Sequence, residues 1–293
     1  MELRHIRYFL AVAEERNFTR AAERVGIGQP PLSQQIRDLE NEIGAPLFHR
    51  LPYGAELTPA GNAFLAEVKP ILAAAARAKE AALRAYRGEE GSLALGLTAS
   101  AGFNPVVSRA LREFRRRWPG VKLTLNELNT LQMLRDLREE KLDAIFVRPG
   151  EDELEGLRLR RFADEAMLIA LPASHPLAGR EALPLAALAA EPFVLYPPAA
   201  GLSLYHEIVS ACRACGFEPI AAQSAPQITS VINLVAAELG VSIVPESAAQ
   251  IRVQGVEYRR IEGIAPVAKL GLATRKSGRS AAVENFLRMM PAS

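Results

Sequence analysis

The sequence is poor in cysteine and histidine, and it contains no long apolar run. Only two of its 293 residues are cysteines and four are histidines. Two cysteines exclude the disulfide framework that holds many small secreted domains together. Residues 1–9 mix charged and apolar side chains, unlike a signal peptide, and no apolar run is long enough to cross a membrane. We therefore expect a cytoplasmic protein with no membrane contact.

An excess of one charge is also absent. The formal net charge is +2, and the first 58 residues carry seven arginines against eight acidic residues. If this region binds nucleic acid, its positive charge must be concentrated at the contact surface, because the region as a whole is not basic. The length exceeds what one compact core needs and predicts two or three domains.

Motifs typical of enzymes are missing too. The sequence contains no GxSxG, P-loop, HExxH or glycine-rich dinucleotide fingerprint. We expect no enzymatic activity, no cofactor and no metal site. A catalytic grouping assembled from distant residues leaves no local motif, so an enzyme stays open as an alternative.

The N-terminal region has the periodicity of three helices. Leu3, Ile6, Leu10 and Ala13 define one apolar face, and a second short helix lies between the capping residues Asn17 and Gly26. The third helix opens with prolines, which the first turn tolerates. Its apolar side is expected to comprise Leu32, Ile36, Leu39 and Ile43.

The opposite side of this third helix is polar, with Ser33, Gln34, Arg37 and Asn41. Short side chains with amide and guanidinium groups are what a helix entering the DNA major groove requires. A solvated helix surface would have a similar composition. Residues 47–50 and 56–58 are expected to pair as a hairpin, or wing, in which Arg50 and Tyr53 reach backbone phosphates.

Two runs in this region, AAERVGIGQPPLSQQIRDLENEIGAPLFHR and LTPAGNAFL, resemble the N-terminal domain of LysR-type transcriptional regulators. A weaker likeness continues to the C-terminus and is closest to the benzoate- and muconate-responsive regulators of aromatic degradation. The resemblance implies a winged helix-turn-helix at residues 1–58 that recognises operator sequences in double-stranded DNA, with RNA polymerase as a further partner. Many family members carry arginine where this chain has Gln34, so one DNA contact is expected to differ. The expected DNA-binding residues are Thr19, Gln29, Pro30, Pro31, Ser33, Gln34, Arg37, Arg50 and Tyr53.

Residues 59–87 are expected to form a long linker helix. Its apolar stripe consists of Phe64, Val68, Ile71, Ala75, Ala78, Ala82 and Tyr86. A stripe of this length on a connector predicts a homodimer interface, although packing on its own domain would give the same pattern. Pro70 is expected to bend the helix. The family resemblance further implies a homotetramer built from two dimers.

Beyond residues 88–91, short apolar runs alternate with amphipathic helices, which predicts a parallel α/β domain over residues 88–293. We expect one lobe at about residues 91–161 and 267–293 and a second at about 162–266, with a strand at 267–273 returning to the first. Two crossings between lobes are suited to hinge closure over a cleft. The resemblance implies a fold similar to periplasmic solute-binding proteins, which makes a solute-binding protein the second function class.

Polar residues at two strand-to-helix turns, around Ser100 and Thr130, predict a site for a small carboxylate effector. Arg148 is expected to add positive charge. Simple helix capping by Ser100 and Thr130 is the competing interpretation. With the positions that the resemblance implies, the expected effector site comprises Ser100, Ala101, Thr130, Arg148, Leu204, Gln227 and Ile228.

Cys212 and Cys215 are separated by one helical turn. This spacing is compatible with a redox pair or half of a zinc site. No pair of histidines has a spacing that would complete such a site, and Ile208 and Val209 nearby indicate an apolar setting. We expect both cysteines to be small core residues.

Overall fold

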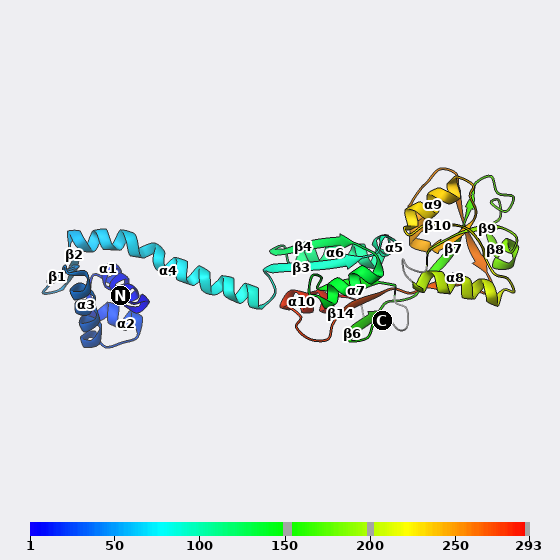
Figure 1. Cartoon of the computed structure of the whole chain (residues 1–293). Coiled ribbons are helices and arrows are strands. Elements are labelled where there is room, and N and C mark those ends of the chain that lie inside the picture. Colours follow the sequence, from blue (N-terminus) through cyan, green and yellow to red (C-terminus); the bar gives the residue numbers. More distant parts are fainter. Residues whose placement is uncertain (149–153, 198–201, 291–293) are drawn as a thin grey trace. The chain divides into compact units, whose positions relative to one another are not determined.

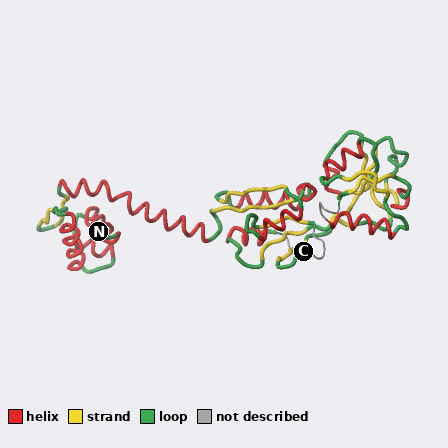
Figure 2. Tube along the Cα trace, in the orientation of Figure 1, coloured by secondary structure: helices red, strands yellow, loops and turns green. Residues whose placement is uncertain are grey.

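The computed structural model describes residues 1–148, 154–197 and 202–290 (Figures 1 and 2). The chain divides into two compact units, Met1–Arg84 and Ala85–Ser293. The chain is of mixed α/β class, with strands concentrated in the second unit. Within the described residues, every helix is too short or too polar to traverse a lipid bilayer.

The first unit contains three helices, a small hairpin and the start of a long helix. Asn17 caps the second helix by accepting hydrogen bonds from the amides of Thr19 and Arg20, and Gly26 ends it with φ of 75°. Gly44 ends the third helix in the same left-handed conformation, which glycine adopts without a steric penalty. The elements are α1 (Leu3–Glu15), α2 (Phe18–Val25), α3 (Gln29–Ile43), β1 (Phe48–Leu51), β2 (Gly54–Leu57) and α4 (Pro59–Tyr86).

The core of this unit is built on α1. Phe9 contacts Phe48 and Phe64 with ring centroids 5.2 and 4.9 Å apart. The predicted apolar face of α1 is confirmed for Ile6, and Leu10 and Ala13 pack partly buried against the same core, but the prediction was wrong for Leu3, which is exposed. Both α2 and α3 contact α1, so its buried surface is broad and comprises His5, Ile6, Phe9, Ala11 and Val12.

The helix α4 is partly a core element of its own unit. Val68 is buried in the core, and Phe64 and Leu72 pack against it. The prediction that one continuous stripe faces a partner subunit was therefore wrong for Phe64 and Val68. Farther along, Ile71 and Tyr86 are 37% and 83% exposed.

The second unit begins with a five-stranded sheet, ordered β4-β3-β5-β14-β6. The neighbours β4 and β5 run parallel to β3, whereas β14 is antiparallel to both β5 and β6. One face packs on α6 (Pro105–Arg117) and α10 (Ala281–Met289), and the other packs on α7 (Thr130–Arg138). The strands are β3 (Gly91–Leu97), β4 (Val121–Glu127), β5 (Ala144–Val147), β6 (Leu157–Arg161) and β14 (Gly271–Arg275).

The second lobe contains another sheet, ordered β11-β7-β12-β8, and a parallel pair of β9 and β10. Its core joins these strands to α8 (Leu202–Ala214) and α9 (Ile228–Ala236). The strands are β7 (Glu165–Pro172), β8 (Ala182–Pro184), β9 (Pro192–Leu195), β10 (Ile220–Ser224), β11 (Ser242–Pro245) and β12 (Val256–Glu262). Short 3₁₀ turns lie at Leu185–Leu188 and Glu246–Gln250.

Two chain segments connect the lobes and lie side by side. The amide of Phe162 donates to the carbonyl of Leu270 over 2.9 Å. The predicted continuous strand at 267–273 was wrong, because β13 (Val267–Ala268) pairs with β7 of the second lobe, and only β14 joins the first sheet. The interruption at Lys269 and Leu270 is where the chain passes from one sheet to the other.

Candidate nucleic-acid interface and ligand pocket

The exposed side of α3 presents a chain of polar side chains. Gln34 donates to Asp38 over 2.8 Å, and Arg37 donates to the Gln34 carbonyl oxygen over 2.9 Å. Gln29, Pro30 and Pro31 are also exposed at the start of the helix. These contacts hold amide and guanidinium groups on the solvent side of α3. Groups of these kinds are able to recognise base edges in a major groove.

The position of Ser33 differs from the prediction. Its side chain was expected on the exposed face, but the residue is only 5% exposed. Its hydroxyl accepts a hydrogen bond of 2.9 Å from the Gln29 amide. Ser33 thus orients Gln29, and the neighbouring Leu32 and Ile36 fill the core below it. Ile43, predicted on the apolar side, is exposed at the last turn of the helix.

The hairpin β1–β2 forms as predicted, with Leu51 paired to Gly54 across Pro52 and Tyr53. Tyr53 is 97% exposed at the tip. The Arg50 guanidinium lies 5.0 Å from the centre of the Phe18 ring, which holds this cation beside the start of α2. Thr19, whose amide is capped by Asn17, is exposed at the same place.

In the second unit, a pocket of about 410 Å³ lies between the two lobes. Six of the seven predicted effector residues line it. Ala101 does not, because it is buried in the core of the first lobe. The lining residues from the first lobe are Thr98, Ala99, Ser100, Glu127, Leu128, Asn129, Thr130 and Arg148, and those from the second are Tyr196, Ser203, Leu204, Pro226, Gln227 and Ile228.

Other residues perform the capping that Ser100 and Thr130 were alternatively expected to provide. Thr98 accepts from the amide of Ala101, and Asn129 accepts from the amide of Gln132 over 2.8 Å. Ser100 and Thr130 are the second and first residues of their helices, α5 (Ala99–Gly102) and α7. The capping interpretation is therefore wrong for both.

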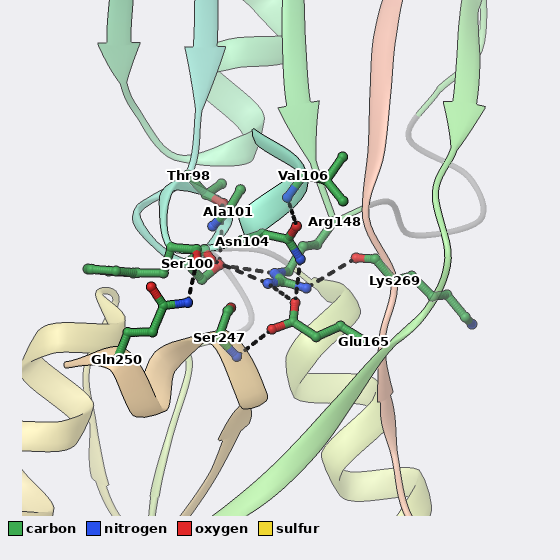
Figure 3. A network of polar contacts seen from close by, with 11 residues as sticks. Thr98, Ser100, Ala101, Asn104, Val106, Arg148, Glu165, Ser247, Gln250 and Lys269 are labelled. Carbon is green, nitrogen blue, oxygen red and sulfur yellow. Dashed lines mark hydrogen bonds and ion pairs between the residues drawn. The ribbon is translucent and has the colours of Figure 1, made fainter. Parts of the chain in front are cut away.

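Arg148 leaves the end of β5 and enters a network that joins the lobes (Figure 3). Its Nε donates to the Ser100 hydroxyl over 3.2 Å, and its Nη2 lies 3.0 Å from a Glu165 carboxylate oxygen. Its Nη1 donates to the carbonyl of Lys269, in the returning segment, over 3.5 Å. Arg148 lines the pocket, where it was expected, but its positive charge is balanced by Glu165.

Glu165 is the second centre of this network. Its carboxylate accepts from the Asn104 amide over 2.9 Å and from the backbone amide of Ser247 over 2.7 Å. Burial opposes ionisation of Glu165, but Arg148 and the hydrogen bonds from Ser247 and Asn104 outweigh it, so its pKa lies below the usual value. One carboxylate thereby links the first strand of the second lobe to α6 of the first.

Tyr196 lines the pocket with a hydroxyl that is buried and has no hydrogen-bond partner among the described residues. Burial raises the pKa of this phenol well above its ordinary value, so it is a neutral donor. Asn104, Glu165, Tyr196 and Ser247 were missed in the sequence. Their sequence neighbours carry no motif, and only the crossing between lobes brings them together.

Cys212 is buried in the core of the second lobe, and Cys215 packs against that core. Burial raises the pKa of the Cys212 thiol to about 11, which disfavours the reactive thiolate. Among the residues that the structure describes, no group of three or more metal-ligating side chains is assembled. The described environment is that of small core residues.

Comparison with known proteins identifies both units. Residues 3–62 match the model described as "Bacterial regulatory helix-turn-helix protein, lysR family", and residues 86–292 match the "LysR substrate binding domain". The chain belongs to the LysR family of transcriptional regulators. It binds DNA through the helix-turn-helix unit and carries an effector-binding domain, so it is a regulator and not an enzyme.

Individual relatives extend over the whole chain. The HTH-type transcriptional regulator BudR of Raoultella terrigena is 42% identical over 99% of this chain and 100% of its own. The full-length regulator CbnR, solved in complex with its target DNA, is 28% identical with a TM-score of 0.83 and covers 99% of this chain and 98% of its own. Full-length BenM is 27% identical with a TM-score of 0.60, covering 99% of this chain and 95% of its own.

Proposed function

We propose that this regulator responds to a small carboxylate that binds between the lobes at Ser100 and Thr130. The observation that carries the proposal is the pocket itself, which is lined from both lobes by hydroxyl and amide groups. A ligand that contacts both lobes favours their closed arrangement, and this differential affinity is what shifts a conformational equilibrium. Leu204 and Gln227 supply contacts from the second lobe.

The charges at the pocket favour a monocarboxylate. Arg148 is balanced by Glu165, and Glu127 adds a negative charge at the pocket lining. The helices α7 and α9 begin at the pocket, and their N-terminal amides attract one negative charge. Arg148, the cation among the described lining residues, is already paired with Glu165, so a second carboxylate would lack a counter-charge. Aromatic monocarboxylates are therefore preferred to a dicarboxylate such as muconate.

The likeness to benzoate- and muconate-responsive regulators keeps aromatic acids among the candidate ligands. Its support is limited to the 27–28% identity with CbnR and BenM, against 42% with BudR. The proposed preference for a monocarboxylate over a dicarboxylate therefore rests on the charge balance at the pocket of this chain.

We further propose that Gln29, Pro30, Pro31, Gln34 and Arg37 face the major groove, while Thr19, Arg50 and Tyr53 contact phosphates. Exposure of all eight supports these roles. Ser33 acts by holding Gln29. RNA polymerase is proposed as the partner that contacts the DNA-bound regulator.

Dimerisation is proposed to use the exposed part of α4, from Ile71 to Tyr86. The segment is rich in alanine, which lets two helices approach closely, and the exposed Ile71 and Tyr86 supply apolar area. A tetramer would need a second contact elsewhere.

Calorimetric titration of the full-length protein with mono- and dicarboxylates, benzoate and muconate included, tests the effector proposal. We expect binding of a monocarboxylate that Thr130→Val weakens about tenfold or more, because one hydrogen bond to a charged group is lost. Thr124→Val, an exposed change on β4 outside the pocket, is the matched control. Tight binding that neither Thr130→Val nor Ser100→Ala alters would place the ligand elsewhere.

A further inference from the structure

A second hollow in the first lobe gathers arginines. It has a volume of about 940 Å³, lies between the edge strand β6 and α10, and shares no lining residue with the pocket between the lobes. We refer to it as the arginine groove. Five arginines and one glutamate line it: Arg158, Arg160, Arg161, Arg279, Arg288 and Glu284. The other lining residues are Leu159, Leu272, Thr274 and Leu287.

The strand register explains how the groove forms. In the pairing of β6 with β14, Arg158 lies opposite Thr274 and Arg160 opposite Leu272. Because side chains alternate along a strand, these four residues share one face of the sheet. Leu272 belongs to the core cluster under α10, so this is the face that α10 covers. Arg160 reaches α10 directly, where its Nη1 donates to the carbonyl of Leu287 over 2.5 Å.

Two buried polar atoms of the groove have no hydrogen-bond partner among the described residues. Thr274 is only 1% exposed, and its hydroxyl has no hydrogen-bond partner among the described residues. Arg279 pairs through Nε with Glu284 over 2.8 Å, but its Nη1 is buried without a partner in the same described part of the chain. Buried polar atoms almost always have hydrogen-bond partners. Two buried atoms without a partner at the same hollow therefore indicate that a ligand supplies the acceptor. A hydroxyl and a guanidinium N–H are both satisfied by an oxygen acceptor.

Two of the groove's arginines have no acidic partner among the described residues. Arg158 and Arg288 are exposed, and neither has a carboxylate within ion-pairing distance in the described residues. Glu284 is engaged by Arg279. Among the described residues, an anionic ligand at the groove is therefore offered two guanidinium groups without an acidic partner and two buried donors without an acceptor.

We propose that the arginine groove binds a phosphate group, either inorganic phosphate or a phosphate monoester. A phosphate monoester carries close to two negative charges at neutral pH and three acceptor oxygens, which suits several guanidinium forks at once. The buried Thr274 hydroxyl favours a compact group that enters the groove over a polymer backbone that lies across its rim. The site would let a phosphorylated metabolite act on the first lobe independently of the carboxylate pocket.

Calorimetric titration of the full-length protein with inorganic phosphate, with glycerol phosphate and with malonate tests the proposal. We expect one phosphate site per chain, with affinity reduced about tenfold or more in Arg158→Gln and in Thr274→Val. Arg115→Gln is the matched control, since it removes the same charge from exposed α6 of the same lobe. Thr274→Val removes an unpartnered buried hydroxyl, so its melting temperature should not fall.

Three results would overturn the proposal. The first is absence of saturable phosphate binding, and the second is binding that Arg158→Gln and Thr274→Val leave unchanged. The third is tighter binding of malonate than of phosphate. If phosphate does not bind but Arg158→Gln and Arg288→Gln weaken operator binding, the groove contacts a polyanion instead. Because Thr130→Val should leave phosphate binding intact, these failures are separate from failure of the carboxylate proposal.

Discussion

The Arg148 guanidinium lies 3.0 Å from the Glu165 carboxylate, and the two residues come from different lobes. Arg148 directly follows the central strand β5 of the first sheet, whereas Glu165 starts β7 of the second. Both side chains are almost completely buried. Because Arg148 also holds Ser100 at the pocket, a ligand that moves Ser100 acts directly on the contact between lobes.

Replacing Glu165 should destabilise the effector-binding unit. Glu165→Gln leaves the Arg148 charge buried without its counter-ion, which typically costs about 3–5 kcal/mol. Thermal denaturation should show a lower melting temperature for this unit. Glu207→Gln, which breaks the more exposed pair with Lys269, is the control and should cost much less. Equal effects of the two variants would mean that the buried pair adds no special stability.

The same carboxylate predicts a pH dependence. The pKa of Glu165 in the folded chain is lower than the ordinary value of 4.5, so its ionised form stabilises the fold above that pH. The contribution is lost as the pH falls below 4.5 and through the folded-state pKa. Denaturant unfolding at several pH values should show a constant difference between wild type and Glu165→Gln above pH 4.5, shrinking below it. A difference that grows on acidification would contradict the shift.

A negative charge introduced on α3 should weaken operator binding. Gln34→Glu places a carboxylate on the exposed face proposed to enter the groove, where phosphates repel it. Mobility shifts with the promoter region beside the gene should show a clear loss of affinity with unchanged circular dichroism. Asn41→Asp adds the same charge near the other end of α3 and should have a smaller effect. Equal affinities for wild type and Gln34→Glu would remove this face of α3 from the DNA.

The linker helix gives a prediction for assembly. Ile71→Asp places a charge at the proposed interface, and burying it would cost several kcal/mol, so the dimer should dissociate. Sedimentation should show a smaller species than wild type. Val68→Asp is not a fair test, since Val68 belongs to the core of its own unit. Lys69→Asp, exposed beside it, is the control, and an unchanged mass for Ile71→Asp would exclude this surface.

Local signals predicted local structure well. The caps at Asn17 and Gly26, the prolines that open α3 and the turn of the hairpin all lie within a few residues of the elements they define. The positions of Ser100, Thr130 and Arg148 in the pocket were also predictable, because polar turns after neighbouring parallel strands meet at one sheet edge. Leu204, Gln227 and Ile228 of the second lobe were predicted only from the family resemblance.

What the sequence did not reveal depends on distant contacts. The burial of Ser33 and the buried face of α1 depend on which neighbouring helix covers each side. The partner of Arg148 lies in another lobe, so spacing alone could not show that its charge is balanced. The helix α10 was overlooked although Ser280 as a cap and Val283 and Phe286 at helical spacing marked it. The edge strand β6 reads LRLRR, and its alternating arginines hid its β character.

Ligand-dependent operator binding is the most direct test of the central claim, that a carboxylate between the lobes controls DNA recognition. Fluorescence anisotropy of the labelled promoter region should be measured with the full-length protein while benzoate and other monocarboxylates are titrated. We expect an effective monocarboxylate to change operator affinity or stoichiometry in wild type, and Thr130→Val to need about tenfold more ligand for the same change. Thr130→Val should bind the operator normally without ligand. If the effective ligand acts equally on wild type and Thr130→Val, or if ligand binding in the pocket leaves operator binding unchanged, the account is contradicted.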